Sequence, residues 1–164
     1  CPCYDLSVLA IDMDATKEII CKQLKQKTRK SCDALVVLTN NLDYIEFKSF
    51  KDLIRRSSNE DRRELIQKKI DKYRYDLKDK LEDSFFIMNC LVRYKDINLT
   101  REQLRHFDNL SIYYFILVDF DLENDPAKRL ASKIILKGDR VFSDYDNIFC
   151  CLEEICPDVQ NKLR

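Results

Sequence analysis

Residues 31–50 read S-C-D-A-L-V-V-L-T-N-N-L-D-Y-I-E-F-K-S-F, and this stretch decides the fold that we expect. Residues 32–39 and residues 43–50 are both rich in β-branched and aromatic side chains, and the turn-forming Asn40 and Asn41 stand between them. Two such runs with a short polar connection are typical of adjacent strands. The stretch therefore predicts a β-hairpin.

The second strand of this hairpin places an acid and a lysine side by side. Because side chains alternate between the two faces of a strand, Tyr44, Glu46 and Lys48 share one face. Asp33 opens the first strand, and hairpin pairing brings its carboxylate towards Glu46. Glu18, on a helix predicted before the hairpin, is a third candidate oxygen ligand. Converging carboxylates are what Mg²⁺ or Mn²⁺ requires, so we expect a metal site at Asp33, Glu46 and Glu18.

A metal at this position predicts hydrolysis of a phosphodiester. It would polarise the phosphate and acidify its bound water. Lys48 would position that water or stabilise the charge that develops on phosphorus. We therefore expect Asp33, Glu46 and Lys48 to be the catalytic residues. The same E-x-K spacing is also typical of an ion pair on a solvated strand face, so the residues by themselves leave both interpretations open.

The segments around the hairpin show helical and strand-like patterns without a repeat or a proline-rich linker. We expect a single α/β domain over residues 1–164, with a central sheet covered by helices. A helix over residues 14–27, capped by Asp12 or Asp14, is predicted before the hairpin. One long helix or two consecutive helices over residues 59–94 follow it. A strand over Ser111–Val118, a hairpin over residues 134–141 and a helix over residues 144–163 complete the predicted order.

This order, with Asp33 on one strand and E-F-K at residues 46–48 on the next, resembles the PD-(D/E)xK nuclease superfamily. The resemblance implies a restriction-endonuclease-like fold, a central mixed β-sheet flanked by helices. It implies that Asp33 and Glu46 bind the metal, that Glu18 joins them, and that Lys48 assists the attack. The resemblance is closest over residues 14–50 and rests on element order beyond them. Ser-Cys precedes Asp33 where the family traditionally has a proline.

Composition argues against several other classes. One glycine in 164 residues argues against the glycine-rich phosphate loops of common nucleotide sites. The apolar runs are too short for a membrane-spanning helix and no signal segment opens the chain, so we expect a cytoplasmic protein without a membrane partner. Its 29 basic and 29 acidic side chains cancel, which argues against a broadly basic surface but allows a local basic patch. We interpret the eight cysteines mainly as reduced thiols.

Residues 12–16, D-M-D-A-T, carry a competing signal. They resemble the D-x-D-x-T opening of haloacid-dehalogenase-type phosphatases, in which the first aspartate is the nucleophile. The alternative is that Asp12 and Asp14 cap the predicted first helix.

Other groups of residues leave further alternatives open. His106 is the only histidine, so we expect neither a histidine-based triad nor a zinc site with several histidines. An acidic cluster follows the strand predicted over Ser111–Val118 and is either a cation site or a solvated loop. A set of cysteines near the two ends of the sequence forms either an iron–sulfur or zinc site, or consists of structural thiols. The acidic cluster is Asp119, Asp121, Glu123 and Asp125, and the cysteines are Cys1, Cys3, Cys150, Cys151 and Cys156.

The expected function is that of a Mg²⁺- or Mn²⁺-dependent nuclease acting on nucleic acid, with DNA favoured, as a homodimer or within a larger complex. The alternative is a non-catalytic protein-binding or assembly module that keeps the fold and uses the charged helix at residues 59–94. Basic side chains flank the proposed site, either to track phosphates or as solvated helix faces. They are Lys22, Lys25, Lys27, Arg29 and Lys30 before Asp33, and Arg55, Arg56, Arg62 and Arg63 after Lys48.

Overall fold

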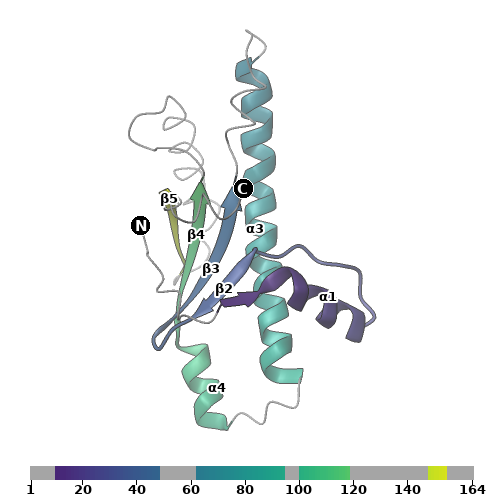
Figure 1. The fold of residues 1–164 in the computed structure, drawn as a ribbon, viewed down its shortest axis with the longest axis vertical. Helices are drawn as coiled ribbons and strands as arrows, with labels where there is room; N and C mark the ends of the chain where they lie inside the picture. The colour runs from purple at the N-terminus through teal and green to yellow at the C-terminus, as the bar shows by residue number, and fades with distance from the viewer. Residues whose placement is uncertain (1–9, 49–61, 95–99, 119–147, 155–164) are drawn as a thin grey trace.

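A computed structural model describes residues 10–48, 62–94, 100–118 and 148–154, with the side chains of residues 10–48, 76–93, 100 and 105–117. Its strands are β1 (Ala10–Asp12), β2 (Ala34–Val37), β3 (Asn41–Lys48), β4 (Ser111–Val118) and β5 (Ile148–Glu154), and its helices are α1 (Met13–Gln23), α3 (Arg62–Tyr94) and α4 (Arg101–Asp108). The strands form one sheet in the order β1-β2-β3-β4-β5 (Figure 1).

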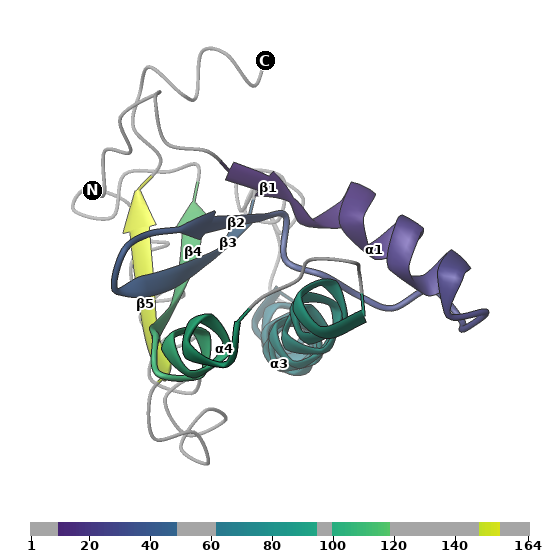
Figure 2. The ribbon, with the colours of Figure 1, turned by 90° about the horizontal axis from the view of Figure 1, so that it is seen from below.

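The sheet is mixed. β1 with β2 and β2 with β3 pair antiparallel, whereas β3 with β4 and β4 with β5 pair parallel. A parallel pair needs a long crossover between its strands, and the chain between β3 and β4 contains α3 and α4. Figure 2 shows both helices on the same side of the sheet. The sheet and its helices place the described part of the chain in the α/β class that the sequence predicts.

The main core lies between the sheet and α3. Leu77, Leu81, Ser84, Met88 and Val92 recur along α3 at steps of three or four residues, and all five are buried. This spacing aligns them on one face of the helix. They face the sheet residues whose side chains point to the same side, chiefly Leu35, Tyr44, Tyr114 and Ile116, and Met13 and Ile20 of α1 complete the core.

The helix α1 begins and ends at recognisable signals. The Asp12 carboxylate caps it by accepting a hydrogen bond of 2.9 Å from the amide of Ala15. At the other end Lys25 adopts a left-handed φ of 52°, and the amide of Gln26 donates to the carbonyl of Cys21 over 3.0 Å. This backbone reversal ends the helix at Gln23, before the predicted end at residue 27.

The hairpin, the strand at Ser111–Val118 and a single long helix from Arg62 onward confirm those sequence predictions. The predicted C-terminal helix is wrong for Ile148–Glu154, which is a strand. Its residues pair in parallel with β4 along its whole length, and such tertiary pairing outweighs a local helical pattern. The sequence prediction also missed β1 and α4. The predicted hairpin at residues 134–141 and the acidic cluster at residues 119–125 lie outside the described residues.

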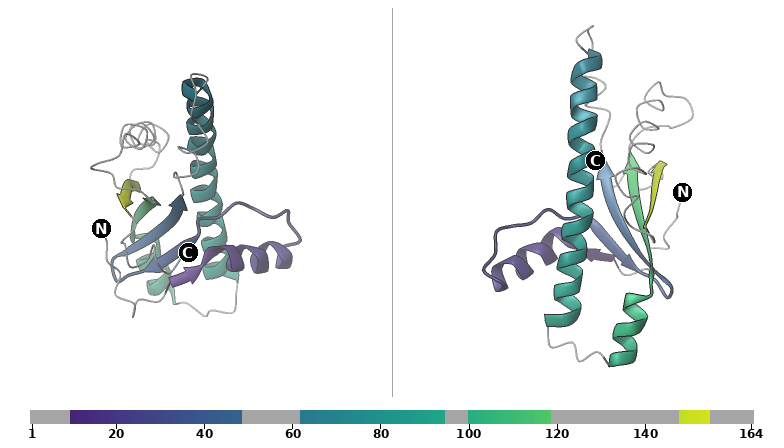
Figure 3. Two further views of the ribbon diagram at one scale, coloured as in Figure 1. Left: turned by 45° about the horizontal axis from the view of Figure 1, so that its top comes forward. Right: turned by 180° about the vertical axis from the view of Figure 1, so that it is seen from behind.

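The long helix α3 continues past the ends of the strands in both views of Figure 3. At 33 residues it is about 50 Å long at the usual rise per residue. Among the described residues, no helix is both long enough and apolar enough to cross a membrane.

Candidate functional site

Glu46 and Lys48 lie on the face of β3 that points to α3, as the alternation predicts. The side chain of Glu46 is 0% exposed, and its Oε1 lies 2.5 Å from the Nζ of Lys48. Tyr44 lies on the same face, two residues before Glu46, and is buried in the main core. The two-residue spacing thus sets an acid and a lysine in direct contact at the end of the strand.

Asp33 is attached to the same strand by two hydrogen bonds. Its amide donates to the carbonyl of Ile45 over 3.0 Å, and its Oδ2 accepts from the amide of Phe47 over 2.6 Å. These two contacts bracket Glu46 in the sequence of β3. The hairpin therefore brings Asp33 beside Glu46, as the sequence predicts.

Lys80, on α3, completes the group, and the sequence analysis missed it. Its Nζ lies 2.6 Å from Oε1 of Glu46 and 4.0 Å from Oδ1 of Asp33. We call Asp33, Glu46, Lys48 and Lys80 the carboxylate-lysine cluster. A signal for Lys80 existed in the sequence, because it falls three residues after Leu77 and next to Leu81, inside the apolar stripe of the helix.

A chain of hydrogen bonds holds α3 at the height where Lys80 meets the strand. The Oγ of Ser84 donates to the carbonyl of Lys80 over 2.7 Å, and the amide of Cys32 donates to the same Oγ over 2.8 Å. Ser84 and Cys32 are both fully buried. Because Cys32 precedes Asp33, this contact couples the position of Lys80 on the helix to the position of the Asp33 carboxylate.

Burial and charge oppose each other at Glu46. Burial raises the pKa of Glu46, the hydrogen bonds and charges of Lys48 and Lys80 lower it, and the nearby Asp33 raises it, so that the pKa lies above its ordinary value. Burial lowers the pKa of Lys80, but the hydrogen bond and charge of Glu46, followed by Asp33, outweigh burial and leave it raised. The buried Oε2 of Glu46 has no hydrogen-bond partner among the described residues. An acceptor of this kind is costly to leave unused.

The third predicted ligand, Glu18, lies on the exposed side of α1. No hydrogen bond or ion pair joins its side chain to another described residue. Asp14, one turn earlier, is the acid of α1 that interacts with this region: its Oδ1 accepts from Lys17 over 2.5 Å and from Ser31 over 2.7 Å. The hydrogen bond from Lys17 lowers the pKa of Asp14, and burial raises it. The hydrogen bond from Ser31 and the charges of Lys17 and Lys80 lower it further, so that the pKa lies below its ordinary value.

The described side chains contain no group of three or more His, Cys, Asp or Glu residues placed to hold a metal ion together. The predicted set of three carboxylates is thus not assembled there. Asp33 and Glu46 do converge, since both contact the same ammonium. Mg²⁺ often binds through only one or two carboxylates and keeps several waters. The pair, with the unused Oε2 of Glu46, fits that kind of site.

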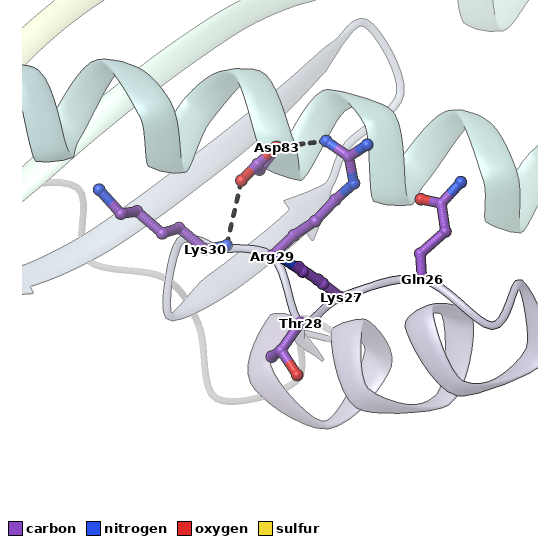
Figure 4. Close-up of a pocket in the computed structure, with 6 residues that line it drawn as sticks. All are labelled: Gln26, Lys27, Thr28, Arg29, Lys30 and Asp83. Atoms are coloured by element: carbon purple, nitrogen blue, oxygen red, sulfur yellow. Dashed lines mark hydrogen bonds and ion pairs between the residues drawn. The ribbon is translucent and has the colours of Figure 1, made fainter.

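A separate set of ion pairs joins the connection after α1 to α3, and Figure 4 shows the part of it in which Arg29 and Lys30 bond Asp83. Arg29 bonds Asp83 over 2.7 Å and stacks 3.9 Å above the ring of Phe86, and Lys30 bonds Asp76 and Asp79 over 2.7 and 2.9 Å. We call Arg29, Lys30, Asp76, Asp79 and Asp83 the surface clamp. It borders a pocket of about 450 Å³ lined by Gln26, Lys27, Thr28, Arg29, Lys30 and Asp83.

Other candidates from the sequence have structural roles where they are described. Asp12 caps α1, as the capping alternative predicts. The Nε2 of His106 lies 3.1 Å from the Thr39 carbonyl oxygen. Cys21, Cys32 and Cys90 are free and buried, in agreement with reduced thiols. Burial raises the pKa of the Cys32 thiol to about 12. No side chain of the terminal cysteines is described.

Comparison of the chain with known protein families, with curated proteins and with solved structures finds no match.

Proposed function

We propose that this α/β domain has a restriction-endonuclease-like fold and is a metal-dependent nuclease, with DNA as the favoured substrate. The observation that carries the proposal is the convergence of Asp33 and Glu46 on one ammonium, with Lys48 beside them on the same strand face. The strand that directly follows Asp33, the E-x-K strand, a helix and a parallel strand follow one another in the order that the PD-(D/E)xK resemblance implies.

In this proposal Asp33 and Glu46 would hold a Mg²⁺ or Mn²⁺ ion. The bound ion would polarise the phosphate and acidify a water molecule. Lys48 contacts Glu46 from the strand end, where its ammonium is partly exposed. From there it can place its positive charge on a phosphate oxygen as negative charge develops, which stabilises the transition state. The buried carboxyl of Glu46 and the backbone bonds of Asp33 keep both acids fixed, which lowers the cost of organising the site.

The charge balance of the cluster favours a second candidate, a non-catalytic binding or assembly module. Two lysines already neutralise two carboxylates. Such a set is complete without a metal, and a buried set of ion pairs can act as a purely structural connection. The two candidates differ in one property, the binding of a divalent ion.

The test combines metal binding with cleavage. Mn²⁺ and Mg²⁺ are titrated by calorimetry into the chain, into Asp33→Ala and into the control Asp83→Asn, which alters an acid of the surface clamp. Cleavage of labelled single- and double-stranded DNA and RNA is followed in parallel. A nuclease binds the metal and cleaves in an EDTA-sensitive way, and loses both properties in Asp33→Ala alone. A chain that binds no metal and cleaves nothing is the assembly module.

A further inference from the structure

The position of Lys80 bears on how a metal enters the proposed site. Its ammonium is hydrogen-bonded to Glu46 over 2.6 Å and forms a longer ion pair with Asp33 over 4.0 Å. Lys48, by contrast, reaches Glu46 from the same strand. Lys80 is the cation that the two acids share, and this is the position that a divalent ion held by both acids needs.

We propose that Lys80 is an internal competitor of the divalent metal: its ammonium occupies the space between Asp33 and Glu46, and the metal binds only as this ammonium withdraws. The inference rests on the proposed function, because it concerns the metal of that same site. It assigns to Lys80 the role of a positioning residue that sets metal affinity, distinct from the role of Lys48 towards the phosphate.

Electrostatics makes joint occupancy unfavourable. Oε1 of Glu46 already contacts two ammonium groups at 2.5 and 2.6 Å. A divalent ion on the same carboxylate would add two positive charges within a few ångströms of both lysines, where Glu46 is fully buried and water screens poorly. One of the cations therefore has to leave. Lys80 is the one that obstructs both ligands.

Lys80 also has room to move. Its side chain is 23% exposed, and a lysine carries its charge on a flexible four-carbon stem. The backbone of α3 can stay in place while the ammonium moves, because the Ser84 hydroxyl, which accepts from the amide of Cys32, bonds the carbonyl of Lys80 and not its side chain.

The experiment measures Mn²⁺ affinity of the full chain by calorimetry and by the loss of the free-ion paramagnetic resonance signal. Lys80→Met keeps most of the stem and removes the charge. We expect it to bind Mn²⁺ at least about tenfold more tightly than the unaltered chain, a coupling of ordinary size between two ligands of one site. Lys78→Met, two residues away and paired with Glu82, is the control and leaves the affinity unchanged.

A second measurement uses the unaltered chain, so its result does not depend on whether a variant folds. Mn²⁺ should release the Lys80 ammonium and raise its rate of acetylation several-fold, read by mass spectrometry against Lys78. The inference is overturned if Lys80→Met binds Mn²⁺ no more tightly than the unaltered chain. It is also overturned if Mn²⁺ does not change the acetylation rate of Lys80.

The results separate this inference from the proposed function. If the unaltered chain binds Mn²⁺ and cleaves, and Lys80→Met binds no more tightly, the competition is wrong and the nuclease stands. If only Lys80→Met binds Mn²⁺, the competition stands and the unaltered chain is not a metal-dependent nuclease. If neither binds, both fail.

Discussion

The surface clamp and the carboxylate-lysine cluster both join α3 to residues that precede it in the chain, and the two sets of ion pairs differ in their exposure to water. In the surface clamp, the lysine and arginine side chains are between a third and a half exposed, with Arg29 paired to Asp83 and Lys30 paired to both Asp76 and Asp79. In the carboxylate-lysine cluster, Glu46 is fully buried and two lysines converge on one of its oxygens. The clamp spreads its charges over the surface, whereas the cluster concentrates them at one buried point.

The difference in burial suits the two sets of ion pairs to different roles. Exposed ion pairs contribute little because water competes for both partners. A buried pair repays the cost of desolvation only with good geometry, and it reacts strongly to the loss of one partner. The hydrogen bonds of Asp76 and Asp79 raise the pKa of Lys30 in the clamp as well, so a shifted pKa is common to both sets. A buried charge held beside specific charged partners is found only in the cluster, and this combination marks a candidate functional site. We therefore expect the clamp to stabilise the fold and the cluster to be the functional site.

The largest expected effect comes from removing the buried charge. In Glu46→Gln we expect Mn²⁺ binding to be lost and cleavage to fall by about a thousandfold or more, since a ligand and a buried charge disappear together. Asp83→Asn in the clamp should leave both unchanged. Calorimetry and single-turnover cleavage measure the effect, and equal losses in the two variants would erase the proposed distinction.

Lys48→Ala should separate chemistry from binding within the cluster. We expect cleavage to fall by about a hundredfold to a thousandfold, because the lost ammonium stabilises developing charge. Mn²⁺ binding should be retained, because Lys48 is not a ligand, and its affinity should change less than in Lys80→Met, because Lys80 pairs with both acids. The measurement is the same pair of assays, and retained cleavage would remove Lys48 from the mechanism.

The clamp should respond in stability and not in activity. Arg29→Met loses the ion pair with Asp83 and the contact with the Phe86 ring. We expect the free energy of unfolding to fall by about 1–2 kcal/mol. Urea denaturation measures this value, and cleavage at a temperature where the variant is folded should match that of the unaltered chain. A loss of cleavage in the folded variant would place the clamp in the site.

The smallest effect is expected at Asp14, which is exposed yet senses Lys80. Its pKa lies below the ordinary 3.8 because of Lys17, so its charge stabilises the fold at pH values above 3.8. This contribution is lost as the pH falls through the lowered pKa. Asp14→Asn should cost less than about 1 kcal/mol at neutral pH, with the difference closing in acid. A carboxyl NMR titration checks the pKa, and Lys17→Met should move it back towards 3.8.

Several features of the fold follow from local pattern. The apolar runs around Asn40 and Asn41 specify the hairpin, and the two-residue period sets Glu46 and Lys48 on one face. Strand β5 could not be predicted in this way, because its residues become a strand by pairing with β4. The choice between Asp14 and Glu18 depends on how α1 is rotated against its neighbours, which packing decides.

The sequence by itself determined the α/β class, the hairpin and the meeting of Asp33, Glu46 and Lys48, since all three lie within one short hairpin. Only the tertiary structure brought Lys80 to Glu46 and Arg29 to Asp83, pairs separated by 34 and 54 residues along the chain. The physical reason is that the repeat of side-chain directions in a strand or helix relates residues within that one element. It does not say which residues of two different elements meet. Which helix face meets which strand depends on the packing of the whole core around α3.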